Sequence, residues 1–118
     1  MTGPAFDEQV LRGWTRGNPK LLARVIEQFR ADRDEFLAQL GQARATGDAA
    51  ALAGAAHSIK GVVATLGGRA AAVAAAEVER LARDRADVSS ALATLEREID
   101  GLAAALARLG EDPRDSQL

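Results

Sequence analysis

At 118 residues, the chain is long enough for one domain with a single hydrophobic core. Its net charge is −2 with acidic and basic residues nearly balanced, which excludes the basic footprint of a nucleic-acid-binding protein. The absence of cysteine excludes disulfides, zinc–thiolate sites, iron–sulfur clusters and thiol catalysis. The sequence contains neither a run of 18 apolar residues nor a signal-peptide pattern, so we expect a soluble, cytoplasmic protein without a membrane segment.

The first predicted element is a short amphipathic helix around Phe6, Val10, Leu11 and Trp14. Aromatic residues make up only 3% of the chain and Ala, Leu, Arg and Glu are frequent, a composition that favours helix over strand. The segment is too short to stand alone, so we expect it to cover one end of a helical fold.

The second predicted helix begins at Asn18-Pro19, with Asn18 as the N-cap and Pro19 at the first helical position. The Thr-Gly-Asp sequence at residues 46–48 is predicted to end this helix and to cap the next one.

The third predicted helix stops at Gly67-Gly68, and the fourth covers about residues 69–84. Asp87 is the predicted cap of the last helix, which runs through Val88 to Leu109 with apolar residues at alternating spacings of four and three. We expect the polar residues 110–118 to form a frayed tail.

Each long helix has one apolar stripe and the connections are short, so the helices need one another for burial. The sequence therefore predicts an all-α fold: an antiparallel, up-down four-helix bundle with a short additional amino-terminal helix. Residues 1–118 form a single domain with a core of about residues 5–109.

The only histidine, His57, lies on the third predicted helix. On a helical wheel it falls about 160° from Ile59, the centre of the apolar stripe. This position argues against a buried structural histidine. The apolar stripe comprises Leu52, Ala55, Ala56, Ile59, Val62, Val63 and Leu66.

Small residues surround His57 at turn-to-turn spacing, whereas exposed helical faces normally carry long polar side chains. Glycine inside a helix costs roughly 1 kcal/mol relative to alanine. We therefore interpret these positions as a docking surface that allows a partner to approach the imidazole. A cation, Lys60, lies three residues after His57 and could hold an acquired anionic group. The predicted docking surface comprises Ala53, Gly54, Gly61 and Ala64.

The sequence HSIKGVVATLGG resembles the signature of histidine-containing phosphotransfer (HPt) domains, which reads approximately His-x-Leu-Lys-Gly, five mostly small or apolar residues, then Gly. The signature is matched by His57, Ile59 in place of Leu, Lys60, Gly61 and Gly67. The helices before and after the motif are similar to those of the family, so the resemblance covers about residues 5–109.

The resemblance implies a phosphocarrier of a two-component phosphorelay, with His57 as the residue that accepts and donates the phosphoryl group. It implies that Lys60 stabilises the phosphoryl charge and that Gly61 keeps the approach open. In some members, a carboxylate at the position of Glu79 hydrogen-bonds the inner ring nitrogen of the histidine. From the sequence alone, this role and that of a solvated glutamate are equally compatible with Glu79.

The implied partner is the receiver domain of a response regulator, and a histidine kinase or hybrid sensor kinase is a further candidate donor. The chain has no Gly-rich nucleotide loop and no carboxylate cluster attached to a recognisable site, so we expect no kinase activity and no cofactor of its own. Mg²⁺ is expected on the receiver domain. We expect a monomer with a transient interface of at most about 1,200 Å².

Two other interpretations explain less of the sequence. In a non-catalytic helical interaction module, the small-residue surface would receive a partner helix and His57 would be incidental. A metal- or cofactor-binding bundle would need Glu-x-x-His pairs on facing helices, and the sequence has none. Whether the chain is a free-standing carrier or a domain of a larger kinase stays open at this point.

Overall fold

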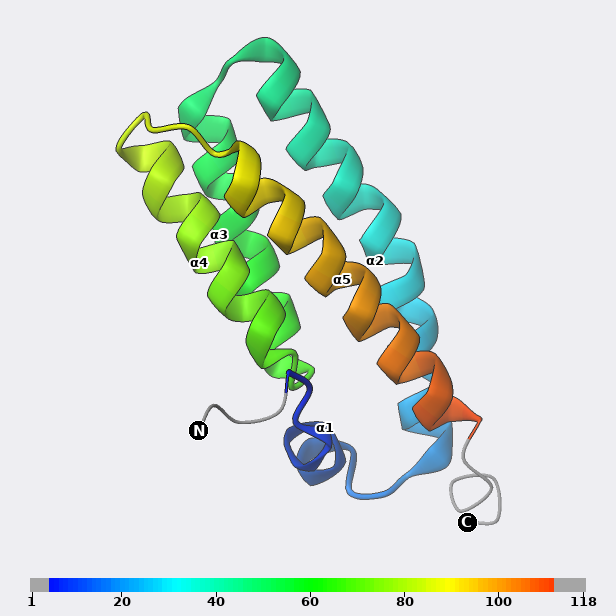
Figure 1. Cartoon of the computed structure of the whole chain (residues 1–118). Helices are drawn as coiled ribbons and strands as arrows, with labels where there is room; N and C mark the ends of the chain where they lie inside the picture. The colour runs from blue at the N-terminus through cyan, green and yellow to red at the C-terminus, as the bar shows by residue number, and fades with distance from the viewer. Residues whose placement is uncertain (1–4, 112–118) are drawn as a thin grey trace.

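The computed structural model describes residues 5–111 and contains five helices in this part of the chain (Figure 1). The prediction of an all-α fold is confirmed, because no strand occurs among the described residues. The helices are α1 (Glu8–Thr15), α2 (Pro19–Thr46), α3 (Ala49–Thr65), α4 (Arg69–Arg83) and α5 (Ser89–Gly110).

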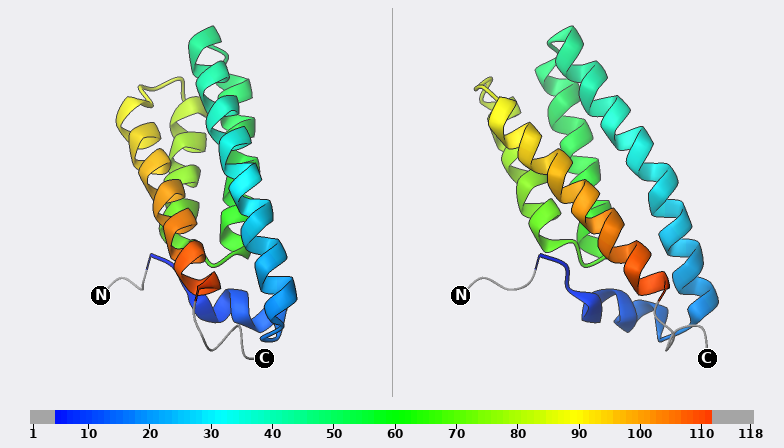
Figure 2. Two further views of the ribbon diagram at one scale, coloured as in Figure 1. Left: turned by 90° about the vertical axis from the view of Figure 1, so that its right-hand side faces the viewer. Right: turned by 45° about the vertical axis from the view of Figure 1, so that its right-hand side comes forward.

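The four long helices lie side by side, and successive helices run in opposite directions (Figures 1 and 2). Among the helix pairs, α3 and α4 make the most extensive contact. The core is made almost entirely of Leu, Ile, Val, Phe and Ala side chains on the inner faces of α2 to α5. The largest fully buried side chains are Phe29, Leu11, Leu40, Ile59, Leu92, Leu95, Ile99, Leu106, Val63 and Val78.

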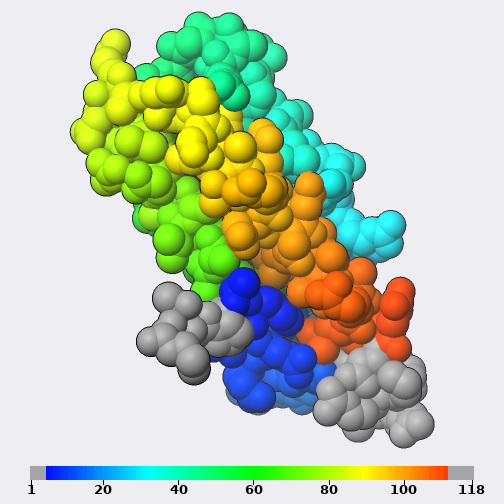
Figure 3. All heavy atoms as spheres, in the orientation of Figure 1, coloured from blue at the N-terminus to red at the C-terminus, as the bar shows by residue number. Residues whose placement is uncertain are grey.

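The short helix α1 crosses one end of the bundle, beside the start of α4 and the end of α5 (Figures 2 and 3). Leu11 is fully buried, and the indole Nε1 of Trp14 donates a hydrogen bond of 2.9 Å to the carbonyl oxygen of Thr65, at the end of α3. The backbone N–H of Asp7 donates to the carbonyl oxygen of Gly67 at 2.7 Å. The helix is therefore attached to the carboxyl end of α3, as expected for a cover over one end.

The predicted caps of α2 and α3 are confirmed. The side chain of Asn18 accepts hydrogen bonds from the N–H groups of Lys20 and Leu21 and that of Asp48 accepts one from Ala51, which satisfies donors left free at the helix starts. Gly47 ends α2 with a φ of 70°, a left-handed conformation that glycine adopts without strain.

The start of the last helix differs slightly from the prediction. Oδ1 of Asp87 accepts a hydrogen bond of 2.9 Å from the N–H of Ser89, so Asp87 does satisfy a free donor there. The helix α5 begins at Ser89, and Val88 precedes it. The predicted tail at residues 110–118 falls mostly on residues 112–118, which lie outside the described residues, and Gly110 is the last residue of α5.

Candidate functional site

The side chain of His57 projects from the middle of α3 and is 61% exposed. The residues of α3 that point inward are a different set, which includes Leu52, Ala56, Ile59 and Val63. Because the apolar stripe fixes the rotation of α3 in the bundle, His57 is held on the outer face, as the periodicity predicted.

Glu79 of α4 reaches across to His57. Nδ1 of the imidazole lies 3.2 Å from Oε2 and 3.3 Å from Oε1 of the Glu79 carboxylate. The Glu79 side chain is only 12% exposed, because it lies between the two closely packed helices. The question that the sequence left open is thereby answered: Glu79 contacts the ring.

The contact determines which ring nitrogen is free. A carboxylate can only accept hydrogen bonds, so Nδ1 must carry the proton that it donates to Glu79. In a neutral imidazole, Nε2 is then left without a proton and keeps its lone pair. The ring of His57 is therefore oriented with a nucleophilic nitrogen available for chemistry.

Lys60 lies beside the same carboxylate. Its Nζ is 3.4 Å from Oε1 of Glu79, and its side chain is 38% exposed. The lysine thus stands next to His57 on α3 without being buried, and its long stem leaves it free to turn toward a group on the imidazole.

A second cation, Arg83, was missed in the sequence. Its Nη2 and Nε donate to Oε2 of Glu79 at 2.7 and 3.2 Å. The pKa of Glu79 is lowered from 4.5 to about 2. The hydrogen bond from Arg83 is the largest cause, burial opposes it, and His57 and Lys60 make smaller contributions in the same direction as Arg83. The signal in the sequence was the four-residue spacing of Glu79 and Arg83, which places both on one face of a helix.

The predicted docking surface is only partly exposed. Gly54, Gly61 and Ala64 are exposed, and a Cβ added at Gly54 or Gly61 would meet no atom within 4 Å. The fold therefore does not require glycine at these two positions. The prediction that Ala53 belongs to this surface is wrong: its exposed fraction is 5%, because it lies on the side of α3 that faces Ala82 of α4.

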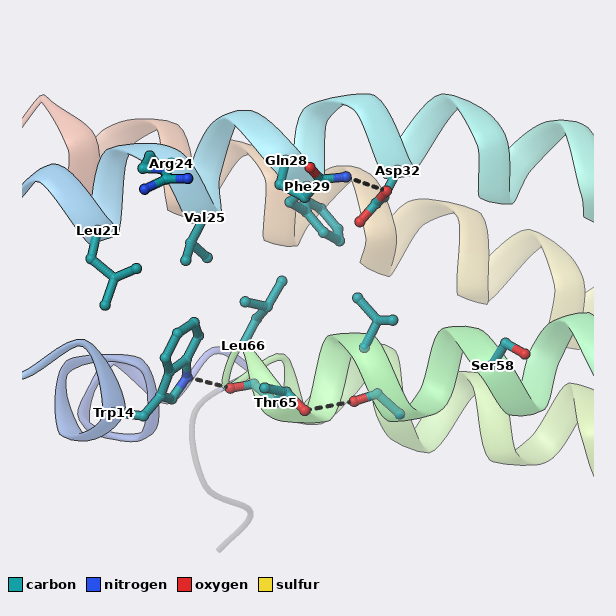
Figure 4. A pocket seen from close by; sticks show the side chains of 12 residues that line it. Trp14, Leu21, Arg24, Val25, Gln28, Phe29, Asp32, Ser58, Thr65 and Leu66 are labelled. Carbon is teal, nitrogen blue, oxygen red and sulfur yellow. Dashed lines mark hydrogen bonds between the residues drawn. The ribbon is translucent and has the colours of Figure 1, made fainter.

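An apolar groove lies on the side of α3 that faces α2, away from α4, and is lined by residues of α1, α2 and α3 (Figure 4). Its volume is about 870 Å³, and it opens to solvent. Figure 4 shows Trp14 and Leu66 on one wall and Val25 and Phe29 on the facing wall. Gly61 also lines the groove, which therefore reaches the small residues beside His57. The lining residues are Trp14, Leu21, Arg24, Val25, Gln28, Phe29, Asp32, Ser58, Gly61, Val62, Thr65 and Leu66.

The opposite side of the site is basic. Arg83 and Arg85 line a smaller depression between α3 and α4, next to Gly54. His57 thus lies between an apolar groove on the α2 side and arginines on the α4 side.

Two features are absent from residues 5–111, the part of the chain that the structure describes. No group of three His, Cys, Asp or Glu side chains gathers there in a way that could hold a metal ion. None of the helices in this range has the length and apolar character needed to cross a bilayer.

An exposed histidine oriented by a carboxylate on a helical bundle is the arrangement expected of a phosphohistidine carrier. The Hpt domain model matches residues 24–110, a range that includes His57, Lys60 and Glu79. The chain belongs to the Hpt domain family, whose members carry phosphoryl groups on histidine in phosphorelays and have no kinase activity of their own. Neither the comparison with curated proteins nor that with solved structures found a match.

Proposed function

We propose that this protein is a phosphorelay intermediate in which Nε2 of His57 accepts a phosphoryl group from the aspartate of a receiver domain and returns it to another. A kinase domain is the alternative donor. The observation that carries the proposal is the hydrogen bond between Nδ1 of His57 and Glu79, because it leaves the exposed Nε2 as the nucleophile.

The transfer step needs no additional general acid or base. The lone pair of Nε2 attacks phosphorus, the N–P bond forms, and the P–O bond to the aspartate breaks as its carboxylate leaves with the bonding electrons. The proton stays on Nδ1, so the phosphorylated ring becomes positive and faces the Glu79 carboxylate. In the reverse step, an aspartate oxygen attacks phosphorus and the electrons of the N–P bond return to Nε2.

Phosphoryl transfer depends mainly on alignment and on neutralisation of the charge on the phosphoryl oxygens. We assign the neutralisation of this charge to Lys60. Its Nζ lies 3.4 Å from Oε1 of Glu79, the carboxylate that also contacts the ring, and it can turn to the phosphoryl group. Mg²⁺ belongs to the receiver partner in this proposal.

The docking surface has three parts that together set the orientation of the receiver. Gly54, Gly61 and Ala64 allow close approach at His57, and the adjoining groove offers apolar contact area on α2. On the other side, Arg83 and Arg85 would face the acidic residues of a receiver active site. We propose that the chain binds as a monomer, in the cytoplasm, through its antiparallel four-helix bundle.

The proposal is tested by incubating the protein with phosphoramidate, a small N–P phosphodonor, and separately with a panel of phosphorylated receiver domains. We expect an acid-labile, base-stable phosphate on the wild type and none on His57→Gln. An unlabelled wild type with every donor contradicts the proposal. In that case, retained receiver binding by both proteins would favour the non-catalytic interaction module, for which the groove provides a surface.

A further inference from the structure

Glu79 is held by three cationic or ring donors, and they do not share its two oxygens equally. Both contacts from Arg83 go to Oε2, at 2.7 and 3.2 Å. The contact from Lys60 goes to Oε1, at 3.4 Å. Nδ1 of His57 lies almost equally far from both oxygens. Arg83 therefore makes the shortest contact with the carboxylate that orients the ring.

The ion pair between Arg83 and Glu79 lies within the single helix α4. Glu79 and Arg83 are four residues apart on α4, with the glutamate nearer the amino end, which is the favourable order for an ion pair on a helix. The carboxylate is 12% exposed, whereas the arginine side chain is 62% exposed. The arginine therefore lies on the solvent side of a carboxylate that is itself nearly covered.

The division of the oxygens matters when the phosphoryl group arrives. In the proposed function, Lys60 turns from Oε1 toward the phosphoryl oxygens, and the carboxylate loses one of its partners. Because Arg83 is bound to Oε2 alone, its contact does not depend on Lys60. Glu79 then stays in place, and ionised, against the positive ring.

We propose that Arg83 is a positioning residue for phosphoryl transfer, which holds Glu79 in the conformation that keeps the proton of His57 on Nδ1. This inference rests on the proposed function of His57. Without Arg83, the Glu79 side chain is free to rotate away from the ring, and part of the protein then carries the proton on Nε2. That tautomer has no lone pair on Nε2 and cannot attack phosphorus.

The test compares Arg83→Gln, Arg83→Lys and Arg80→Gln with the wild type. Arg80 is the matched control, because it lies on the same helix and pairs with Glu77 and Asp84 instead of Glu79. The donor is phosphoramidate, which needs no docking surface and so separates positioning from the binding of a receiver. Loss of an outer partner of a functional histidine commonly costs about 10-fold or more in affinity or activity in metal sites.

We expect the phosphorylation rate of Arg83→Gln to fall on the order of 10-fold. Arg83→Lys, which keeps a donor for Oε2, should recover a large part of the rate, and Arg80→Gln should match the wild type. The ring ¹⁵N spectrum of His57 should show one protonated Nδ1 and one unprotonated Nε2 in the wild type, and averaged signals in Arg83→Gln. A merely structural role for Arg83 would not change this spectrum.

Wild-type rates and an unchanged ¹⁵N spectrum in folded Arg83→Gln would overturn the inference while leaving the proposed function intact. An equal loss of rate in Arg80→Gln would overturn it as well, because the effect would then be general to α4. If Arg83→Gln does not fold, as judged by circular dichroism, Arg83→Met, which keeps a long side chain but has no donor for Oε2, is measured in its place with the same expected rate and spectrum. A wild type that phosphoramidate and phosphorylated receivers cannot label would instead refute the proposed function.

Discussion

Nδ1 of His57 lies 3.2 Å from Oε2 of Glu79, and this contact joins the two most closely packed helices of the bundle. The histidine is largely exposed, whereas its carboxylate partner is nearly covered. Glu79 on α4 thus orients the ring from a nearly covered position, and the ring of His57 on α3 stays accessible to a partner. Each of the following predictions tests one part of this arrangement.

Replacement of Glu79 separates hydrogen bonding from charge. In Glu79→Gln the amide oxygen can still accept the Nδ1 proton, whereas Glu79→Ala removes both the acceptor and the charge. We expect the rate of phosphorylation by phosphoramidate to fall about 10-fold or more in Glu79→Ala and by less in Glu79→Gln. Equal rates in the wild type and Glu79→Ala would show that the contact has no part in the transfer.

The stability of the protein should depend on the ionisation of Glu79 at low pH. Its pKa is lowered from 4.5 to about 2, chiefly by Arg83, so the folded state binds this proton less readily than the unfolded chain. The stabilisation of the folded state by ionised Glu79 is complete above pH 4.5 and is lost as the pH falls toward 2. In urea denaturation, Glu79→Gln should lose less stability than the wild type between pH 6 and pH 3. The lowered pKa values of Glu77 and Asp87 contribute equally to both proteins. Identical losses would contradict the assigned pKa.

Gly61 offers a test of the docking surface. An alanine Cβ at this position meets no atom within 4 Å, so Gly61→Ala should stabilise the helix by up to about 1 kcal/mol. Gly61→Glu should fold, keep its labelling by phosphoramidate, and lose transfer from receiver domains. The matched control is Gly101→Glu on α5, where a Cβ also meets no atom within 4 Å. Normal receiver transfer in Gly61→Glu would mean that this part of α3 does not face the partner.

Trp14 reports on the groove, because it is the only tryptophan of the chain and its side chain lines the apolar wall. The residue is 41% exposed in the free protein. Docking of a receiver domain over the groove should therefore move its fluorescence emission to shorter wavelength. Saturating complex formation with no change in the emission would exclude the groove from the interface.

The core beneath the site should be far more sensitive than its surface. Ile59 is fully buried on α3, so Ile59→Ala should cost about 2–5 kcal/mol of the free energy of unfolding. Val73 of α4 is 72% exposed, and Val73→Ala should change the free energy of unfolding by at most about 0.5 kcal/mol. Chemical denaturation measures both. A similar cost at the two positions would contradict the assignment of the inner faces.

The helices were predictable from the sequence because their ends are marked by local chemistry. Asn18 and Asp48 cap helices through their own side chains, and Gly47 adopts a left-handed conformation within its own turn. None of these features depends on another helix. The exposure of His57 was predictable for a related reason, since the apolar stripe of α3 alone fixes which side of that helix faces outward.

The contacts between helices were not predictable in the same way. Whether Glu79 meets His57 depends on the rotation and offset of α4 against α3, and a helical wheel contains neither quantity. Ala53 was misplaced for the same reason: it is 5% exposed because α4 covers that flank of α3. The groove could not be predicted either, because it forms only where α1, α2 and α3 come together. The sequence shows its apolar residues but not that they share one surface.

The account is tested most directly by the position of the phosphoryl group on the ring. The phosphorylated protein, labelled with ¹⁵N in its single histidine, is measured by ³¹P and ¹⁵N NMR. The orientation of His57 by Glu79 predicts a phosphoryl group on Nε2 and a proton on Nδ1. A phosphoryl group on Nδ1, or phosphate on a residue other than His57, would contradict it.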